Sequence, residues 1–219
     1  ISIENLLGRD EINVNLEYVK PIIENNVVCI TGAGGSIGSE LCIQILKLKP
    51  KKLILLEQSE ISLYRIIENL NDNSSKTKST QLIPILGSAG NSILLENVLN
   101  SNDVGIIFHT AAYKHVPLVE KNPISGIANN VLTTLNICET SLKTKIKQVV
   151  LVSTDKAVRP NNVMGASKRL AEIIFQAFAS RESKIKSKNK NYNPTLFSIV
   201  RFGNVLASSG SVVPLFKKQ

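Results

Sequence analysis

The sequence has few of the residues that build metal sites and disulfide frameworks. Its 219 residues include three cysteines and two histidines. Cys29, Cys42 and Cys138 are far apart and form no CxxC pair, so we expect buried, reduced thiols rather than disulfides or zinc ligands. No matching cluster of Cys, Asp or His accompanies His109 or His115, and we expect both to have a structural or hydrogen-bonding role. The sequence therefore predicts no metal site.

Long apolar runs are also missing. No run approaches the length of a transmembrane helix, and the first residues do not have the pattern of a signal peptide. The chain begins with Ile1 rather than methionine, so we expect a fragment of a longer protein. A hydrophobic content of 43% and a charged content of 20% are ordinary for a soluble globular protein. The length suffices for one α/β domain, or for one domain and part of a second.

Positive charge is in excess, with a net charge of +9. Residues 181–190, RESKIKSKNK, carry five basic residues and one acid. Such a segment can form a patch for nucleic acid, anionic lipid or a phosphate-bearing substrate, or it can be a solvated helix end that runs into a loop. We favour the helix end because no aromatic side chains are interleaved with the basic ones. No nucleic-acid partner is predicted.

Short apolar runs alternate with segments of helical periodicity along most of the chain. Runs that are apolar throughout and bounded by turn residues are typical of strands buried on both faces. They lie at residues 27–31, 52–57, 82–86, 104–109, 148–153 and 196–201. Helical periodicity is found at residues 36–48, 60–71, 92–100, 117–142 and 166–180, and residues 71–80 are loop-like. The alternation predicts an α/β fold with a doubly wound parallel sheet, the Rossmann fold.

A glycine-rich turn separates the first predicted strand from the first helix. Residues 31–38 read TGAGGSIG, with Gly32, Gly35 and Gly38 in GxxGxxG spacing. Glycine permits the tight turn, lets a phosphate approach the backbone and allows the helix to pack closely on the strand. Ser36 and Ile37 begin the helix, whose N-terminus offers N–H groups and a positive dipole end to a pyrophosphate. The turn predicts a dinucleotide site.

Residues at the ends of the second and fourth strands extend this site. Glu57 follows the last glycine by about twenty residues, the expected position of a ribose-binding carboxylate, although a surface acid at a strand end is the alternative. A carboxylate there would repel a 2′-phosphate, so NAD is predicted over NADP, and Arg65 lies too far along the next helix to support NADP. Ala111, Ala112 and Tyr113 are expected beside the dinucleotide, with ordinary small-residue packing an equal alternative for the alanines.

The fifth predicted strand ends in polar residues. Residues 153–156 read Ser-Thr-Asp-Lys, and Met164 and Lys168 follow with i, i+4 spacing, which places both on one helix face. The order resembles that of the extended short-chain dehydrogenase/reductase superfamily, where Ser/Thr, Tyr and Lys occur with YxxxK spacing. A strand-end turn with one surface ion pair is the alternative. We favour a catalytic site because this fold places its chemistry at strand ends.

A closer resemblance covers nearly the whole chain. It is carried by TGAGGSIGSEL (31–41), HTAAYKHVPLVEKNP (109–123), VSTDKAVRPNNVMGASKRLAE (152–172) and RFGNVLASSGSVVPLF (201–216). These motifs resemble the bacterial capsular-polysaccharide-type UDP-N-acetylglucosamine 4,6-dehydratases. The resemblance implies that carbon 4 of a UDP-linked sugar is oxidised by NAD, that water is eliminated across carbons 5 and 6, and that carbon 6 is then reduced. The implied product is a UDP-4-keto-6-deoxy sugar.

The resemblance also implies roles for individual residues. Lys156 matches the base that removes the carbon 5 proton, and Asp155 the acid that protonates the departing hydroxyl. Thr154 can hydrogen-bond the carbon 4 oxygen, and Lys168 matches the residue that holds the nicotinamide ribose. Cofactor or substrate contacts are implied for three further residues: Asn130, Asn204 and, less directly, Lys114.

The chemistry that the resemblance implies requires particular protonation states of Lys156 and Asp155. A lysine base must be neutral and an aspartic acid protonated, so we expect burial to push both pKa values toward neutrality.

The sequence departs from the family in two places. Met164 occupies the usual tyrosine position and cannot take a proton, as in a subgroup of the family. We therefore hypothesise that Asp155 takes the carbon 4 hydroxyl proton during oxidation. Ser88 and Ala89 stand where the family usually has an acid facing the adenine, and they are expected to line that part of the cofactor site.

Two other functions remain open. A UDP-sugar 4-epimerase would depend on the tyrosine that Met164 replaces, and a non-catalytic NAD-binding module would not need the Asp-Lys pair.

We expect residues 1–25 to be a linker and lead-in helix, and residues 26–219 to be the NAD-binding domain with the start of a truncated substrate-binding lobe. The segment LLGR (6–9) resembles the link after a membrane-spanning region. A cytoplasmic homo-oligomer is expected, with membrane contact only through a missing N-terminal region.

Overall fold

The computed structural model describes residues 16–73 and 80–205, and its centre is a parallel sheet. The strands are β1 (Val27–Thr31), β2 (Lys52–Glu57), β3 (Gln81–Leu86), β4 (Ile106–His109), β5 (Gln148–Thr154) and β6 (Leu196–Phe202). Their order is β3-β2-β1-β4-β5-β6, and every pair is parallel. The predicted doubly wound Rossmann fold is confirmed. The strand order reverses between β1 and β4, where ligands bind in this fold.

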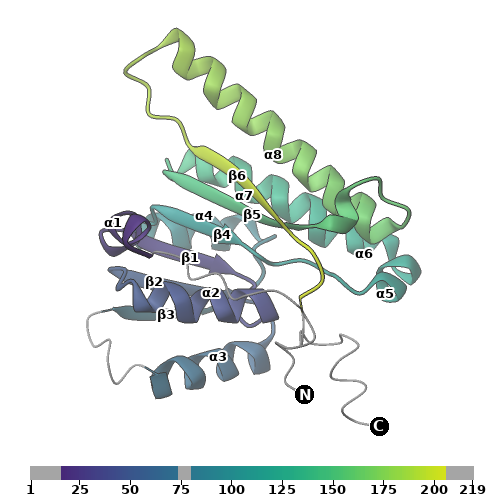
Figure 1. Ribbon diagram of the computed structural model, residues 1–219, viewed down its shortest axis with the longest axis horizontal. Coiled ribbons are helices and arrows are strands. Elements are labelled where there is room, and N and C mark those ends of the chain that lie inside the picture. Colours follow the sequence, from purple (N-terminus) through teal and green to yellow (C-terminus); the bar gives the residue numbers. More distant parts are fainter. Residues whose placement is uncertain (1–15, 74–79, 206–219) are drawn as a thin grey trace.

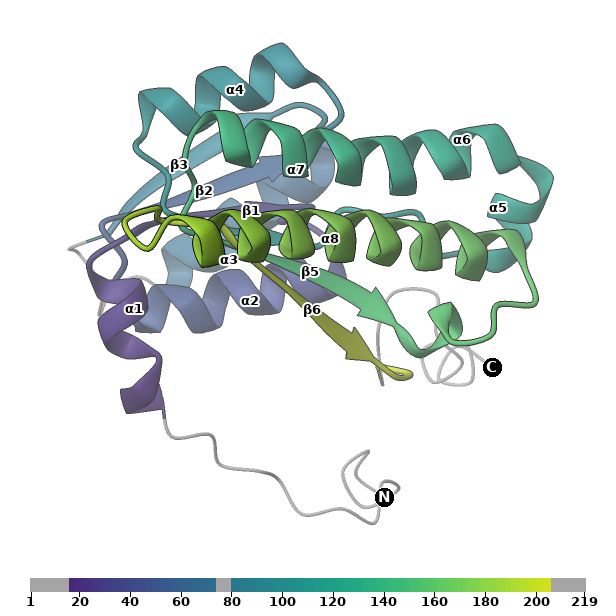
Figure 2. The same ribbon diagram turned by 90° about the horizontal axis from the view of Figure 1, so that it is seen from above.

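Helices cover both faces of the sheet (Figures 1 and 2). They are α1 (Lys20–Glu24), α2 (Ser36–Lys47), α3 (Glu60–Asn73), α4 (Ser92–Ser101), α5 (Val116–Lys121), α6 (Pro123–Ile127), α7 (Thr133–Lys143) and α8 (Val163–Lys188). One apolar core joins the sheet to α4, α7 and α8, and the other joins it to α1, α2 and α3. Because both faces are covered, β1 is buried at every position.

The sheet edges differ from its centre. Residues in β3 and β6 alternate between half-buried and exposed for most of their length, whereas β5 is buried from Val149 to Ser153. On the side of β6 that faces α8, Phe197 packs against Phe175 and Phe178, with ring centroids 5.1 and 5.8 Å apart. These contacts hold the long helix α8 against the strands that end at the polar residues.

Residues 117–142, where the sequence has helical periodicity, do not form one continuous helix. The structure divides this region into α5, α6, a π-helical turn at Ala128–Leu132 and α7. Pro123 lacks an N–H and disfavours helical angles in the residue before it, and Asn122 accordingly has φ −135° and ψ 58°. The π-helical turn contains Asn130, whose side chain bonds outside the helix.

Other boundaries shift less. Helix α8 continues to Lys188, so the basic segment begins as an exposed helix end and then enters a loop, as predicted. Pro21 lies in the first turn of α1, where its missing N–H is tolerated. The LLGR segment and the motif residues from Leu206 onward lie outside the described residues. None of the helices in the described ranges is long and apolar enough to cross a bilayer.

Candidate functional site

The glycine-rich turn joins β1 to α2 with a backbone that other residues would not adopt. Gly32 has φ +69°, and a Cβ at this position would lie 2.7 Å from the Cα of Ala111. A Cβ on Gly38 would collide with the carbonyl oxygen of Gly32. The turn ends at Gly35, the N-cap of α2, which makes no side-chain cap. The first N–H groups of a helix have no partner within the helix, so the turn and helix end can hold a phosphate group.

A small pocket of about 190 Å³ lies beside this turn. It is lined by Gly32, Glu57, Ser88, Ala89, Ala111 and Ala112, among others. The Glu57 carboxylate accepts hydrogen bonds from the backbone N–H groups of Gly34 and Ser59, both at 3.0 Å. It therefore fixes the glycine-rich turn to β2 while remaining on the pocket wall. The predicted ribose and adenine residues lie together here.

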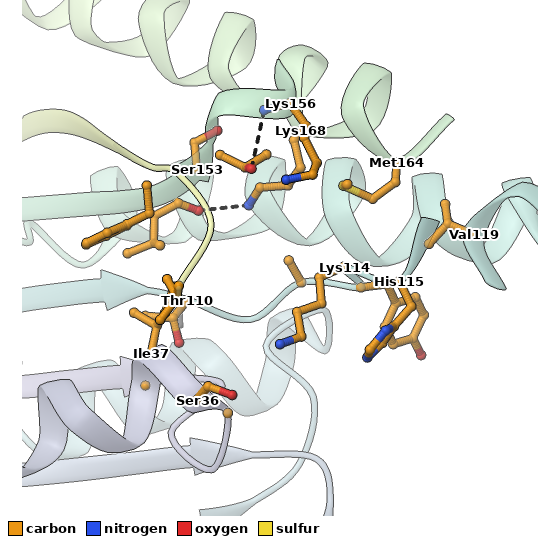
Figure 3. Close-up of a pocket in the computed structure, with 18 of the residues that line it drawn as sticks. Ser36, Ile37, Thr110, Lys114, His115, Val119, Ser153, Lys156, Met164 and Lys168 are labelled. Carbon is orange, nitrogen blue, oxygen red and sulfur yellow. Dashed lines mark hydrogen bonds between the residues drawn. The ribbon is translucent and has the colours of Figure 1, made fainter. Parts of the chain in front are cut away.

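A larger cleft of about 1260 Å³ opens at the carboxyl ends of the strands. Gly35, Ser36, Ile37 and Gly38 form one side, and Lys156, Met164 and Lys168 line the opposite side (Figure 3). Tyr113 and Lys114 also line it, together with Thr154 and Asn204. The structure thus brings nearly all of the predicted cofactor and catalytic residues to two adjoining cavities. Glycines of the turn line both cavities, which suits a phosphate-bearing ligand.

The polar turn after β5 is held by its own hydrogen bonds. Strand β5 ends at Thr154, which caps a 3-10 turn at Asp155–Ala157. Thr154 Oγ1 donates to Asp155 Oδ1 at 3.0 Å. Lys156 Nζ donates to Asp155 Oδ1 at 3.3 Å and to Asn204 Oδ1 at 2.9 Å. Because the strand ends before Asp155, the aspartate and the lysine reach the same region instead of opposite faces of the sheet.

The expected burial of this pair is wrong for the described structure. The Asp155 side chain is 54% exposed and that of Lys156 is 41% exposed. Hydrogen bonds from Thr154 and Lys156, together with the lysine charge, lower the pKa of Asp155, the opposite of the expected direction. Asp155 does not line the cleft wall, although its Oδ2 lies 4.0 Å from the Cβ position of Gly203 at the cleft mouth. In this state Asp155 is ionised at neutral pH.

Lys168 and Met164 are buried in the cleft wall, one helical turn apart on α8. Lys168 is 7% exposed, and its Nζ donates to the backbone oxygen of Val152 at 2.8 Å. Burial lowers the pKa of Lys168 to about 8, although the nearby Glu172 carboxylate opposes this shift. Met164 is 3% exposed. The helix therefore presents one amine and one thioether to the cleft.

Asn130 is buried beside the cleft wall, and its predicted ligand contact stays a prediction. It is 2% exposed and lines neither cavity. Its Oδ1 accepts from the N–H of Tyr113 at 2.8 Å, and its Nδ2 donates to the Tyr113 oxygen at 3.0 Å and to Ser167 Oγ at 2.9 Å. Asn130 therefore fastens the segment after β4 to α8, next to Lys168.

A buried charge cluster lies behind Lys168. The Glu172 carboxylate is fully buried and accepts from Ser153 Oγ at 2.7 Å, Arg169 at 2.9 Å, and Arg201 Nε and Nη2 at 2.7 and 2.6 Å. The hydrogen bond from Arg201 is the largest cause of a Glu172 pKa lowered to about 2. Since Ser153 is in β5 and Arg201 in β6, the cluster joins the ends of the two strands beside Thr154 and Asn204.

The two histidines differ in position. His109 is buried between Thr31 Oγ1 at 2.7 Å and Thr134 Oγ1 at 3.2 Å. Burial lowers its pKa to about 3, so it is neutral and structural, as predicted. His115 instead lines the cleft. No group of three or more potential metal ligands occurs within the described ranges.

Several cleft residues were missed from the sequence. Arg65 lines the cleft near Ser62 and Gly34, which corrects the view that it lies too far along α3. Its position one turn after Ser62 was the available signal, because Ser62 packs directly on the glycine-rich turn. Phe202 and Gly203 also line the cleft, since β6 delivers them beside Asn204. No periodicity in the sequence indicates these contacts.

Comparisons with known proteins agree with this geometry. A family model described as polysaccharide biosynthesis protein matches residues 28–219. The capsular polysaccharide biosynthesis protein CapD of Staphylococcus aureus is 42% identical over 100% of this chain and 35% of its own length. A UDP-N-acetylglucosamine 4,6-dehydratase (inverting) of Campylobacter jejuni is 32% identical over 87% of this chain and 52% of its own.

Other similar proteins are named as 4-epimerases or are solved structures. A UDP-glucose 4-epimerase of Rickettsia canadensis is 33% identical over 89% of this chain and 53% of its own length. Among solved structures, Pen from Bacillus thuringiensis matches with a TM-score of 0.76 and 31% identity, over 90% of this chain and 58% of that one. The chain thus spans between about a third and three fifths of the length of these proteins.

Proposed function

The chain belongs to the polysaccharide biosynthesis protein family, and from this premise we propose that it is a nucleotide-sugar 4,6-dehydratase acting on UDP-N-acetylglucosamine. The observation that carries the proposal is the convergence of Asp155, Lys156 and Asn204 at the cleft mouth, opposite the glycine-rich turn. Elimination of water needs an acid and a base in addition to Lys168 of α8. Epimerisation does not need this pair.

The cofactor is proposed to be NAD. The positive φ of Gly32, the lack of room for a Cβ at Gly38 and the N-terminus of α2 fit a pyrophosphate, and Glu57 fits a ribose hydroxyl. When bound, NAD would oxidise carbon 4 of the sugar and later reduce carbon 6. Lys168 lines the cleft and would hold the nicotinamide ribose and add positive charge there.

The Asp155–Lys156 pair can act in sequence. Asp155 is ionised, so it can accept the hydroxyl proton of carbon 4 during oxidation, with Thr154 bonded to the same group. Once Asp155 is protonated, it no longer holds the Lys156 ammonium by charge. After the Lys156 ammonium has released a proton to solvent at the cleft mouth, its neutral amine can remove the carbon 5 proton, while Asp155 returns its proton to the carbon 6 hydroxyl, which leaves as water. Lys156 finally returns its proton to carbon 5.

The exposure of this pair is consistent with a site that a sugar completes. A sugar ring over the mouth would remove water from Asp155 and Lys156, and desolvation would weaken the charged form of each. The buried Met164 offers an apolar wall where the superfamily has a tyrosine, so the proton acceptor must come from elsewhere. Asp155 meets that need.

Product analysis tests the proposal. The protein is incubated with NAD and UDP-N-acetylglucosamine, and the nucleotide sugar is analysed by mass spectrometry. Loss of one water supports the dehydratase, whereas an unchanged mass with an inverted hydroxyl identifies a 4-epimerase. An unaltered substrate contradicts both and leaves a non-catalytic NAD-binding module.

Two variants separate the roles of the pair. Lys156→Met is expected to stop elimination but to leave NADH formation from bound substrate measurable at its absorbance band. Asp155→Asn is expected to slow NADH formation by about 100-fold or more, the usual contribution of a general base. NADH formation at the wild-type rate in Asp155→Asn would show that another group takes the proton. The homo-oligomeric state and cytoplasmic location implied by the resemblance stay predictions.

A further inference from the structure

The turns that lead into the strands carry an unusual concentration of lysine. Because all strands are parallel, every helix returns to the same amino-terminal edge of the sheet. The returns before β2, β5 and β6 share exposed lysines, which together we name the lysine edge: Lys49, Lys51, Lys145, Lys147, Lys188 and Lys190. Within the described part of the chain, none of these ammonium groups forms an ion pair.

Hydrogen bonds show that these turns are neighbours. The N–H of Lys51 donates to the backbone oxygen of Asn26 at 3.0 Å, and Lys147 Nζ donates to Asn26 Oδ1 at 3.1 Å. The N–H of Leu196 donates to the backbone oxygen of Lys147 at 2.9 Å, which brings the start of β6 alongside. The turns before β2 and β5 and the start of β6 are therefore neighbours at the end of the sheet opposite the cleft, and Lys188 and Lys190 lie in the return that leads into β6.

Backbone strain marks two of these positions. Lys49 and Lys145 have φ of 53° and 56° and follow the C-caps of α2 and α7. Glycine is the usual residue at such a position because a Cβ is strained there. The helix dipole favours a cation near the helix end. Lysine at these two helix ends suits the helix dipole, and Asp103 in the return before β4 has the same positive φ of 53°.

Exposed apolar side chains lie at the same end. Helix α1 directly precedes β1, and Figure 1 shows it at the end of the sheet where the connection from α8 to β6 also lies. Ile23 is buried in the core, whereas Tyr18 is 81% and Ile22 is 50% exposed. Tyr18 ends the 3-10 turn before α1 and Ile22 lies in α1, so two exposed apolar side chains lie close in sequence at this end. Acids in the segments that reach this end include Glu17, Glu24, Asp72 and Asp103.

We propose that the lysine edge, with Tyr18 and Ile22, docks on an anionic lipid surface. Anionic headgroups attract clustered lysines without requiring defined geometry, and Tyr and Ile side chains suit the boundary between headgroups and acyl chains. The returning segments 48–51, 144–147 and 188–195 contain no arginine, whereas bidentate phosphate recognition in nucleic acids favours arginine. The cleft then faces away from the membrane, open to a nucleotide sugar. This contact is additional to any through an N-terminal region.

Vesicle binding tests the proposal with a matched pair of variants. Lys145→Gln/Lys188→Gln removes two charges from the lysine edge, and Lys121→Gln/Arg159→Gln removes two exposed charges from the cleft end. Each chain is mixed with phosphatidylcholine vesicles with and without phosphatidylglycerol, and the bound fraction is measured by flotation. Circular dichroism and thermal melting confirm that both variants fold.

The wild type is expected to bind only the vesicles with phosphatidylglycerol, and less as salt increases. Each lysine near an anionic surface contributes about fivefold, so the edge variant should bind about 25-fold more weakly and the control within about threefold of wild type. Ile22→Ser should weaken binding several-fold. Equal losses in both double variants would show that net charge alone matters and would overturn the proposal. So would the absence of binding, equal binding to phosphatidylcholine, or equally strong binding to duplex DNA or RNA.

Discussion

The buried carboxylate of Glu172 allows a prediction that is worked from the structure. In Glu172→Gln, the amide keeps the size of the side chain and one acceptor oxygen. The carboxylate accepts from Ser153 and Arg201 Nε on one oxygen and from Arg169 and Arg201 Nη2 on the other. The new NH₂ group must therefore face two donors. Breaking a buried ion pair in this way costs about 3–5 kcal/mol of unfolding free energy.

Part of this cost depends on pH. A Glu172 pKa lowered from 4.5 to about 2 corresponds to at most about 3 kcal/mol of stability at neutral pH. Both arginines are partly exposed, so screening reduces this to about 2 kcal/mol. A depressed carboxyl pKa gives stability that is present above the unfolded-state pKa and is lost as the pH falls toward the folded-state pKa. The difference between wild type and variant should thus shrink by about 1 kcal/mol between pH 7 and pH 3.5.

Urea unfolding at the two pH values is the assay, and Glu96→Gln is the matched control. Glu96 forms an exposed pair with Lys143, in which the side chains are 32% and 66% exposed. Its loss should cost less than about 1 kcal/mol at either pH. A cost for Glu172→Gln below that of the control, or one that does not shrink on acidification, would refute the reasoning.

Three further changes have defined outcomes. Lys168→Met removes a buried amine whose pKa is lowered to about 8. Because this amine loses its proton at a lower pH in the folded state than in the unfolded state, the unfolding free energy of the wild type relative to the variant should rise by about 2 kcal/mol between pH 7 and pH 9.5. Urea unfolding at the two pH values measures this change. Gly32→Ala should destabilise by about 2–4 kcal/mol because of its φ of +69° and the contact with Ala111, whereas Gly35→Ala should cost less than half as much. Glu57→Gln should reduce the preference for NAD over NADP, measured as a ratio of Kd values, by about tenfold.

Most of the fold was predictable because strands buried on both faces leave a plain signal. The runs at β1 and β2 were predicted with their observed bounds, since apolar residues fill every position of a strand covered by helices. The region after β4 was not predictable in detail. Its apolar spacing is helical throughout, but Pro123 and the π-helical turn at Asn130 interrupt it. The side chain of Asn130 bonds to the backbone of Tyr113, 17 residues earlier in the chain, and helical spacing does not indicate such a contact.

The site was predictable where chemistry follows strand ends. Gly32, Glu57 and Thr154 are each fixed by position in a strand–helix unit, and the structure gathers them around adjoining cavities. The burial of Asn130 was not predictable from the sequence, because an amide that suits a ligand also suits hydrogen bonds to the backbone, here that of Tyr113. Arg65 was judged too far along the next helix to support NADP, and the structure places it in the lining of the cleft.

The parallel topology also explains how one domain can separate two kinds of surface. Each strand–helix unit leaves the sheet at its carboxyl end and returns at its amino end, so residues after strands form the cleft while residues after helices form the opposite end. Lysines in the returns are therefore far from Asp155 and Lys156 and leave their charge balance undisturbed, because exposed charges beyond about 10 Å are screened at ordinary ionic strength. Charge can accumulate at the lysine edge without altering the acid–base pair. It follows that neutralising Lys145 and Lys188 should change vesicle binding and leave dehydration of the nucleotide sugar unchanged.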